Sequence, residues 1–305
     1  MTPASPRRAA PGVLLALALA ALAPAAAAEL HHSFVPATDG VPLAVTECGT
    51  VAAPAVLLLH GFGQSHLSFS EQFTPQACAQ LHLVAFDLRG HGGSGKPWAP
   101  EAYSERERWA DDVRSVMTAR QLDRPLLVGW SFGGNVALHY IAAHGADSLR
   151  GLLLVGSHGG LLASATSRGG IRSERMAQLS AAAMTPDIPG QIAAAEAFAR
   201  MLTAKPLPDA LARQLLVANL MLPAYARAAM RGLPVDNSGL EGKLTLPVRI
   251  VVGAHDASMD IAALQALAAR LPQASLVVYD DSGHSPFLEE AGRFNRELAG
   301  FSGAR

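Results

Sequence analysis

Short apolar runs alternate with longer stretches of mixed polarity from Ser33 to Tyr279. Runs this short and this uniformly apolar are typical of strands that are buried on both faces of a sheet. They lie at residues 41–46, 56–59, 83–86, 126–128, 152–155, 248–252 and 275–279. The alternation predicts a mostly parallel sheet with helices packed on both of its faces.

One of the intervening helices is marked by a capping signal. Ser104 and Glu107 have the spacing of a capping box, and apolar residues follow at i, i+4, i+7 and i+8 from Trp109. We therefore expect an amphipathic crossover helix here.

The alternation stops between about residues 158 and 243. Ala-rich helical patterns replace the strands there, at 191–202 and 210–222. We interpret 158–243 as a helical cap inserted into a core made of 29–157 and 244–305. A second binding domain is the alternative, but the segment contains no sheet pattern or repeat of its own.

The first 28 residues have the pattern of a secretory signal peptide. Arg7 and Arg8 precede an apolar run from Val13 to Ala23, and small residues follow as far as Ala28. A retained membrane anchor is the alternative, but the run is shorter than the roughly 20 residues that a spanning helix needs. We expect cleavage near Ala28, no stable membrane span afterwards, and a periplasmic or secreted protein.

Charge and cysteine content limit the partners. The formal net charge is -1 and no long basic run occurs, so a nucleic-acid surface is not indicated. The two cysteines, Cys48 and Cys78, could form a disulfide in an oxidising compartment or could each be buried as a small apolar residue. The sequence leaves both possibilities open, and the oligomeric state as well.

The strongest chemical signal is Gly129-Trp130-Ser131-Phe132-Gly133. It directly follows the run 126–128 and precedes a helical pattern at 135–143. A serine on so sharp a strand-to-helix turn needs small residues two positions before and after it. The helix N-terminus also favours negative charge close to the serine oxygen. Ser131 is therefore the candidate nucleophile.

A base and an acid follow Ser131 along the chain. A serine hydroxyl needs a base within hydrogen-bond reach, and the base needs a carboxylate to hold it. Asp256 follows the run 248–252, and His284 follows the last run, at 275–279. Each lies at the C-terminal end of a predicted strand, where open α/β sheets bind their ligands. An acid after the earlier strand, near Gly156, is the alternative, but no carboxylate occurs there.

Two backbone amides are candidates for binding an oxyanion. The first belongs to Phe132, which directly follows the nucleophile. The second belongs to Phe62, in the segment His60-Gly61-Phe62-Gly63 after the run 56–59. The glycines would permit the turn that this position requires.

Several other features have simpler explanations. Gly90 to Gly95 formally matches a dinucleotide-binding pattern, but Lys96-Pro97 follows instead of a helix, so a structural turn is favoured and His91 is expected to be structural. We expect His31 and His32 to belong to a solvated tail. No metal-ligand spacing occurs, and no cofactor is predicted.

The chain resembles the α/β-hydrolase fold family, in particular its single-domain esterases, cofactor-free haloperoxidases and carbon–carbon hydrolases. The motifs that carry the resemblance are His60-Gly61-Phe62-Gly63, residues 87–94, the turn around Ser131, Gly253 to Asp256, and Ser282-Gly283-His284. The resemblance implies an eight-stranded, mostly parallel sheet flanked by helices, with an inserted helical cap. It also implies a Ser131–Asp256–His284 triad.

The same resemblance orders the possible reactions. Epoxide hydrolases and haloalkane dehalogenases of this fold have an aspartate where Ser131 stands, so their chemistry is not expected. Carbon–carbon hydrolases often have asparagine where Trp130 stands. The expected function is therefore hydrolysis of a carboxylic ester of a small or apolar substrate through an acyl-enzyme. The alternatives are hydrolysis of a lactone, amide or carbon–carbon bond, perhydrolase or haloperoxidase activity, and a ligand-binding protein without catalysis.

Overall fold

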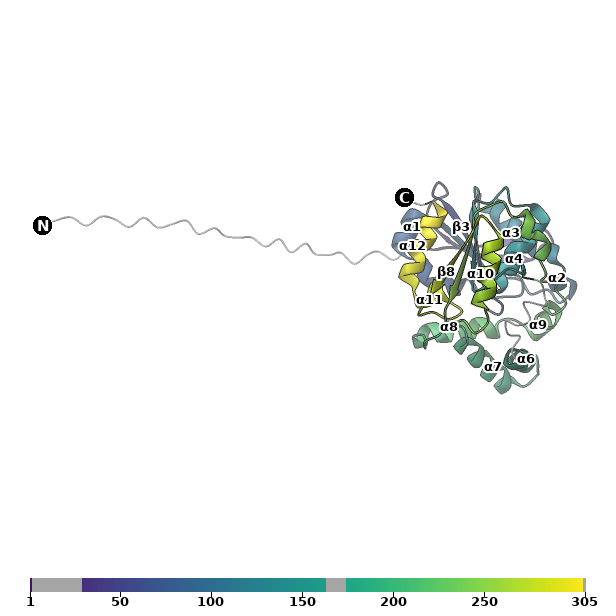
Figure 1. Ribbon diagram of the computed structural model, residues 1–305. Coiled ribbons are helices and arrows are strands. Elements are labelled where there is room, and N and C mark those ends of the chain that lie inside the picture. The colour runs from purple at the N-terminus through teal and green to yellow at the C-terminus, as the bar shows by residue number, and fades with distance from the viewer. Residues whose placement is uncertain (2–28, 163–173, 304–305) are drawn as a thin grey trace.

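The computed structural model describes Met1, residues 29–162 and residues 174–303, and the expected signal peptide lies outside these ranges apart from Met1. One eight-stranded sheet forms the centre of the molecule, in the order β1-β2-β4-β3-β5-β6-β7-β8 (Figure 1). Its strands are β1 (His31–Pro36), β2 (Pro42–Cys48), β3 (Ala55–Leu59), β4 (His82–Phe86), β5 (Leu126–Trp130), β6 (Gly151–Val155), β7 (Val248–Gly253) and β8 (Ala274–Tyr279).

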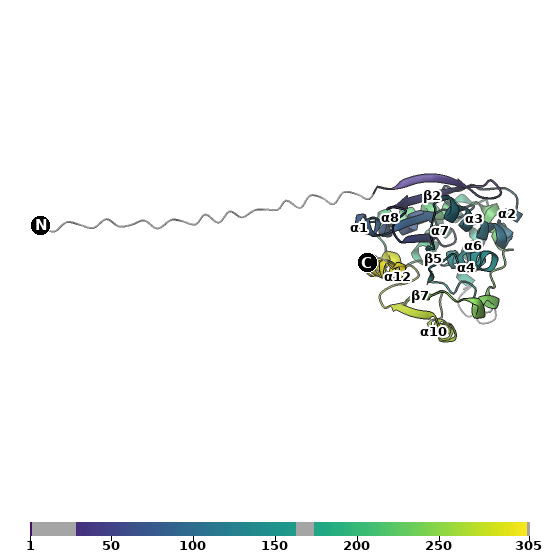
Figure 2. The same cartoon turned by 90° about the horizontal axis from the view of Figure 1, so that it is seen from above.

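Pairing in the sheet is parallel from β4 through β8, and only β1–β2 and β2–β4 are antiparallel. The predicted mostly parallel sheet is thus confirmed. Figure 2 shows β2 and β7 toward opposite sides of the sheet, with β5 between them. Strand β5, which precedes Ser131, is therefore central and has a parallel partner on each side.

Helices cover both faces of the sheet, as expected. Those of the core are α1 (Pro75–Gln80), α2 (Glu101–Ser104), α3 (Arg106–Ala119), α4 (Phe132–His144), α10 (Ile261–Arg270), α11 (Pro286–Glu289) and α12 (Ala291–Ser302), with the 3-10 helix η1 (His66–Gln72). In Figure 1, α1 and α12 lie on one side of the sheet and α3 and α4 on the other.

Alternate residues of the buried strands point into two separate hydrophobic clusters. On β3, Leu57 and Leu59 belong to the cluster beneath α3 and α4, whereas Val56 and Leu58 belong to the cluster beneath α1 and α12. This period of two explains why β3 has no polar position: both of its faces are covered.

Two segments that precede β5 differ from expectation. His31 and His32 are exposed but belong to edge strand β1, where His32 Nδ1 lies 2.9 Å from Thr46 Oγ1. The capping box is also wrong, because Ser104 is the last residue of α2 and α3 begins at Arg106 with Glu105 as its N-cap. The short helix α2 therefore ends at the residue that was predicted to be the N-cap of the longer helix.

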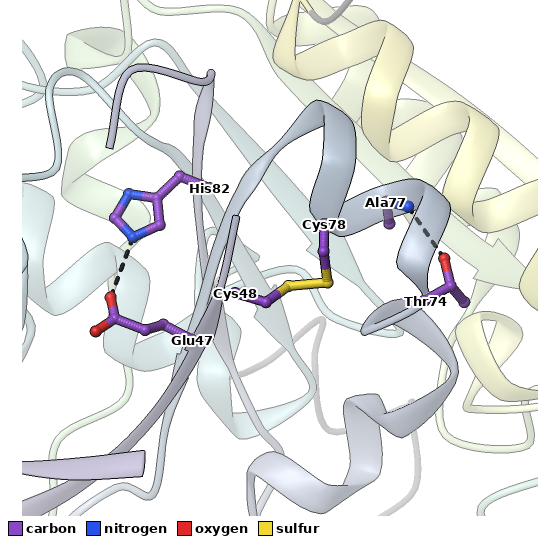
Figure 3. Close-up of a disulfide and its surroundings, with 6 residues drawn as sticks. All are labelled: Glu47, Cys48, Thr74, Ala77, Cys78 and His82. Carbon is purple, nitrogen blue, oxygen red and sulfur yellow. Dashed lines mark hydrogen bonds and ion pairs between the residues drawn. A yellow bond between two sulfur atoms is a disulfide. The ribbon is translucent and has the colours of Figure 1, made fainter. Parts of the chain in front are cut away.

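A disulfide joins Cys48 at the end of β2 to Cys78 in α1 (Figure 3). The bonded alternative is therefore confirmed. Helix α1 is capped beside it by Thr74, whose Oγ1 accepts a hydrogen bond from the Ala77 amide at 3.1 Å. The bridge fixes this short helix to the sheet, since α1 alone is too short to be stable.

The described residues between β6 and β7 form helices and contain no strand. They are α6 (Glu174–Ala182), α7 (Ile188–Arg200), α8 (Asp209–Leu220), α9 (Ala224–Met230) and the 3-10 helix η2 (Ser238–Lys243). Figure 1 shows α6 to α9 gathered at one end of the sheet, near α11. Residues 163–173 of the expected cap lie outside the described residues.

Candidate active site

Ser131 occupies the turn between β5 and α4 with φ +52° and ψ -117°. A side chain pays a steric cost at positive φ, so the surrounding structure must hold this conformation. The Ser131 amide donates to the Val155 carbonyl at 2.9 Å, and the Ser131 carbonyl accepts from the Gly134 amide at 3.0 Å. Ser157 Oγ donates to the same Ser131 carbonyl at 2.8 Å.

The flanking glycines are required by close backbone packing. A Cβ at Gly129 would lie 2.6 Å from Gly134 Cα, and one at Gly133 would overlap the Leu59 carbonyl oxygen. The glycine spacing seen in the sequence therefore has the steric cause that was expected of it.

Asp256 and His284 form a direct hydrogen bond. The loop after β7 carries Asp256 and the loop after β8 carries His284, and His284 Nδ1 lies 2.8 Å from Asp256 Oδ2. Both residues are buried. With its Nδ1–H directed at the carboxylate, the imidazole has Nε2 free to take up a proton.

Ser258 completes the surroundings of the carboxylate. Its Oγ donates to Asp256 Oδ1 at 2.5 Å, its amide donates to the same oxygen at 2.8 Å, and its Oγ lies 2.9 Å from His284 Nδ1. Burial by itself raises the pKa of Asp256, but His284 and the hydrogen bonds from Ser258 outweigh it and lower that pKa below its usual range. Asp256 therefore stays ionised beside the imidazole.

His284 is positioned by the core of the protein. Trp130, the buried residue before Ser131, donates from Nε1 to the His284 carbonyl at 2.9 Å. On another side lies Gly156, where a Cβ would be 2.9 Å from His284 Nδ1. A side chain at Gly156 would therefore crowd the imidazole. No hydrogen bond joins Ser131 Oγ to His284 among the described residues.

The two candidate oxyanion amides lie on neighbouring turns. The Phe62 and Phe132 rings meet edge to face with centroids 6.3 Å apart, and a Cβ at Gly61 would lie 3.2 Å from Ser131 Cβ. Within the described chain, neither amide donates to a backbone carbonyl. The segment 61–63 thus lies beside the candidate nucleophile.

His60 holds the turn that carries Phe62. Its Nδ1 lies 2.8 Å from the Gly61 carbonyl, and its Nε2 accepts from the Leu88 amide at 3.0 Å. This pattern needs a neutral ring with the proton on Nδ1. Burial lowers the pKa of His60 to about 4, so the ring is neutral at physiological pH.

The segment 90–95 is a structural turn, as the sequence favoured. Asp87 Oδ2 accepts from the Gly93 amide at 2.7 Å, and Asp87 Oδ1 accepts from the His66 amide at 2.7 Å. His91 is fully buried against His60, with ring centroids 5.1 Å apart.

The cap contacts the site at two places. A small cavity lies between the cap and the turn at Phe62, and its lining residues are Phe62, Leu179, Ser180, Ala183, Ala194, Phe198, Asn219 and Arg227. Farther along, Glu289 accepts from the Ala204 amide of the cap at 2.6 Å and from the Gly283 amide at 2.7 Å. One carboxylate therefore joins the cap to the loop that carries His284.

Three of these contacts were not foreseen from sequence. Ser258 could have been found by its position two residues after Asp256, because a hydroxyl at that spacing readily bonds the preceding carboxylate. Trp130 and Glu289 act through tertiary contacts that leave no local pattern. Across the described ranges, no cluster of three His, Cys, Asp or Glu side chains could hold a metal ion. Likewise, none of the helices described is both long and apolar enough to span a membrane.

Comparison with known proteins identifies the family. Residues 56–297 match the model of the alpha/beta hydrolase family. The chain is 31% identical over 259 residues to the pimeloyl-[acyl-carrier protein] methyl ester esterase of Chromobacterium violaceum. The matched residues cover 81% of this chain and 93% of that protein.

Solved structures give the same result. The esterase RhEst1 from Rhodococcus sp. ECU1013 has a TM-score of 0.81 and 30% identity, covering 89% of this chain and 98% of that one. Est816, an N-acyl homoserine lactone degrading enzyme, has a TM-score of 0.70 and 28% identity over 88% of this chain and all of that one. This chain belongs to the alpha/beta hydrolase family and has its fold.

Proposed function

We propose that this hydrolase cleaves carboxylic esters through an acyl-enzyme on Ser131. The observation that carries the proposal is the buried Asp256–His284 hydrogen bond beside the positive-φ turn at Ser131. An oriented imidazole next to a serine on such a turn is the arrangement that acyl transfer requires. The esterases among the similar proteins support the same reaction class.

In the proposed reaction, Ser131 Oγ attacks the ester carbonyl carbon and its proton passes to His284 Nε2. The amides of Phe62 and Phe132 bind the oxyanion, and Asp256 stabilises the imidazolium. The tetrahedral intermediate collapses, the carbon–oxygen bond to the alcohol breaks, and His284 protonates the departing alcohol. Water then loses a proton to His284 and attacks the acyl carbonyl carbon. The bond to Ser131 Oγ breaks, His284 returns the proton to that oxygen, and the acid is released.

The Ser131–His284 hydrogen bond forms, in this proposal, when substrate binds. Catalytic hydrogen bonds are often long in the free enzyme and shorten in the complex. The cavity beside Phe62 is small and most of its walls are apolar, which supports a small ester. Hydrolysis of a lactone is the second candidate, because the same steps open a cyclic ester and Est816 degrades lactones of one class.

A fluorophosphonate label tests the nucleophile. We expect stoichiometric labelling of the purified chain, its loss in Ser131→Ala, and full labelling in Ser148→Ala, which removes an exposed serine outside the site. Peptide mass spectrometry locates the label. Labelling that survives in Ser131→Ala, or that maps to another residue, contradicts the proposal.

We also propose that the chain is exported and loses its first 28 residues. The Cys48–Cys78 disulfide supports this, since such bridges persist in oxidising compartments. Mass spectrometry of the N-terminal peptide from fractionated cells tests the proposal. We expect a periplasmic or extracellular protein that begins at Glu29, and a protein that keeps Met1 and stays with the cytoplasmic fraction would contradict it.

A further inference from the structure

A buried arginine of the cap lies against the turn that carries Phe62. Arg227 belongs to α9 and is only 6% exposed. Its guanidinium carbon lies 5.5 Å from the centroid of the Phe62 ring, and a Cβ at Gly63 would lie 3.6 Å from Nη1. A positive charge therefore lies beside the turn that carries the proposed oxyanion-binding amide.

The hydrogen bonds of Arg227 all go to uncharged groups. Nε donates to the Leu222 carbonyl at 3.1 Å, and Nη2 donates to the carbonyl of Asn219 and to its side-chain Oδ1. Among the residues that the structure describes, Arg227 forms no ion pair with Asp or Glu, and its Nη1 donates no hydrogen bond. One edge of the guanidinium is thus unused.

Arg89, a second buried arginine, has a different environment and pairs with carboxylates. Arg89 is held by Asp112 at 2.6 Å and by Asp39 at 3.0 Å, and its pKa is raised despite burial because of these carboxylates. Burial without such a partner lowers the pKa of Arg227 to about 10, which still leaves it charged at neutral pH. A buried charge without a counterion is costly, so a binding role would explain why it is kept.

A small cavity lies beside Arg227. Its walls are mostly apolar, from α6 and α7, and Phe62, Asn219 and Arg227 complete it. A guanidinium that is shielded from bulk water binds a carboxylate more strongly than one in water does.

We propose that Arg227 binds a carboxylate of the substrate, so that the preferred substrates are esters that carry a carboxylate a few bonds from the cleaved carbonyl. The inference rests on the proposed function, because it takes the bound ester to be the substrate of Ser131. The carboxylate could be on the acyl side or on the alcohol side of the ester, and the experiment separates the two.

Binding to the Ser131→Ala protein, measured by calorimetry, tests the inference without turnover. Monomethyl glutarate carries the carboxylate on the acyl side and 4-acetoxybutyrate carries it on the alcohol side. The neutral controls are dimethyl glutarate and methyl 4-acetoxybutyrate. We expect one of the two carboxylates to bind about tenfold or more tightly than its neutral ester, as charge-assisted hydrogen bonds allow.

Adding Arg227→Gln should abolish this preference. Arg213→Gln is the matched control, because it removes the same charge from an exposed position of the cap helix α8 and should keep the preference. Should Arg227→Gln fail to fold, as judged by circular dichroism, Arg227→Lys should still reduce the preference at least about threefold, since lysine lacks the planar fork.

The inference is overturned if neither carboxylate is preferred, or if the preference survives in the folded Arg227 variant. Hydrolysis of the two neutral esters by the unaltered chain is a separate readout. If that hydrolysis is absent while the binding preference is present, the proposed function fails and the anion site stands. If hydrolysis occurs without any binding preference, the anion site fails and the proposed function stands.

Discussion

Gly156→Ala should reduce catalysis by displacing His284. Gly156 has φ +52°, and a Cβ there would lie 2.9 Å from His284 Nδ1 and 3.0 Å from the His284 carbonyl oxygen. Ordinary contacts begin near 3.4 Å, so the imidazole and its backbone must both move by about half an ångström. Because a misplacement of about 1 Å can cost about 100-fold in rate, we expect kcat/KM to fall at least about tenfold.

Positive φ alone also costs stability, so this cost must be separated from the clash. An alanine at positive φ costs about 1–2 kcal/mol. Gly40→Ala is the matched control, since Gly40 has φ +82° and no atom lies within 4 Å of an added Cβ. We expect both variants to lose unfolding free energy, measured in urea, and only Gly156→Ala to lose kcat/KM for a short-chain 4-nitrophenyl ester.

The reasoning is refuted if Gly156→Ala keeps kcat/KM within about threefold of the unaltered chain. It is also refuted if Gly40→Ala loses as much activity, because strain and not displacement of His284 would then be the cause.

Three further predictions concern other parts of the site and the fold. Ser258→Ala removes a hydrogen bond to the ionised Asp256 and should lower kcat/KM for the same ester about tenfold, with partial recovery in Ser258→Thr; unchanged kinetics would mean that the hydroxyl is dispensable. The neutral, buried His60 should make stability decrease by about 3 kcal/mol as the pH falls from 6.5 to 4, because the unfolded chain takes up a proton that the folded chain refuses. Urea unfolding of His60→Gln at pH 6.5 and 4.5 should show a smaller decrease, and parallel curves would contradict this. Replacing both Cys48 and Cys78 by alanine should cost about 4 kcal/mol by the loop-entropy estimate for a separation of 30 residues, with ester hydrolysis retained below the melting temperature; equal melting temperatures in calorimetry would refute that estimate.

The sheet was predictable because its physical requirements are local. Runs such as 56–59 are apolar at every position, since both faces of the strand are covered, and this pattern is visible without any tertiary information. The edge strand β1 was missed because it lacks this pattern. Most of its residues are exposed, so His31 and His32 look like part of a solvated segment. An edge strand is defined by its neighbour β2 and not by its own composition.

The candidate site was predictable where chemistry dictates the residue type. Ser131, Asp256 and His284 each follow a recognisable strand, and the structure brings Asp256 and His284 into contact. The supports of His284 were not predictable in the same way. Trp130 Nε1 bonds a carbonyl 154 positions away, and the space at Gly156 is closed by His284 itself, so neither contact has a signature within its own segment.

Glu289 has a consequence for how such enzymes could be recombined. Its carboxylate accepts hydrogen bonds from the backbone amides of Ala204 in the cap and of Gly283 in the loop that carries His284, and neither contact depends on a side chain of the cap. To preserve this junction, a cap grafted from another hydrolase would need only a turn that presents an amide at the position of Ala204. Chimaeras that keep this one backbone junction could exchange substrate preference while the placement of the histidine is preserved.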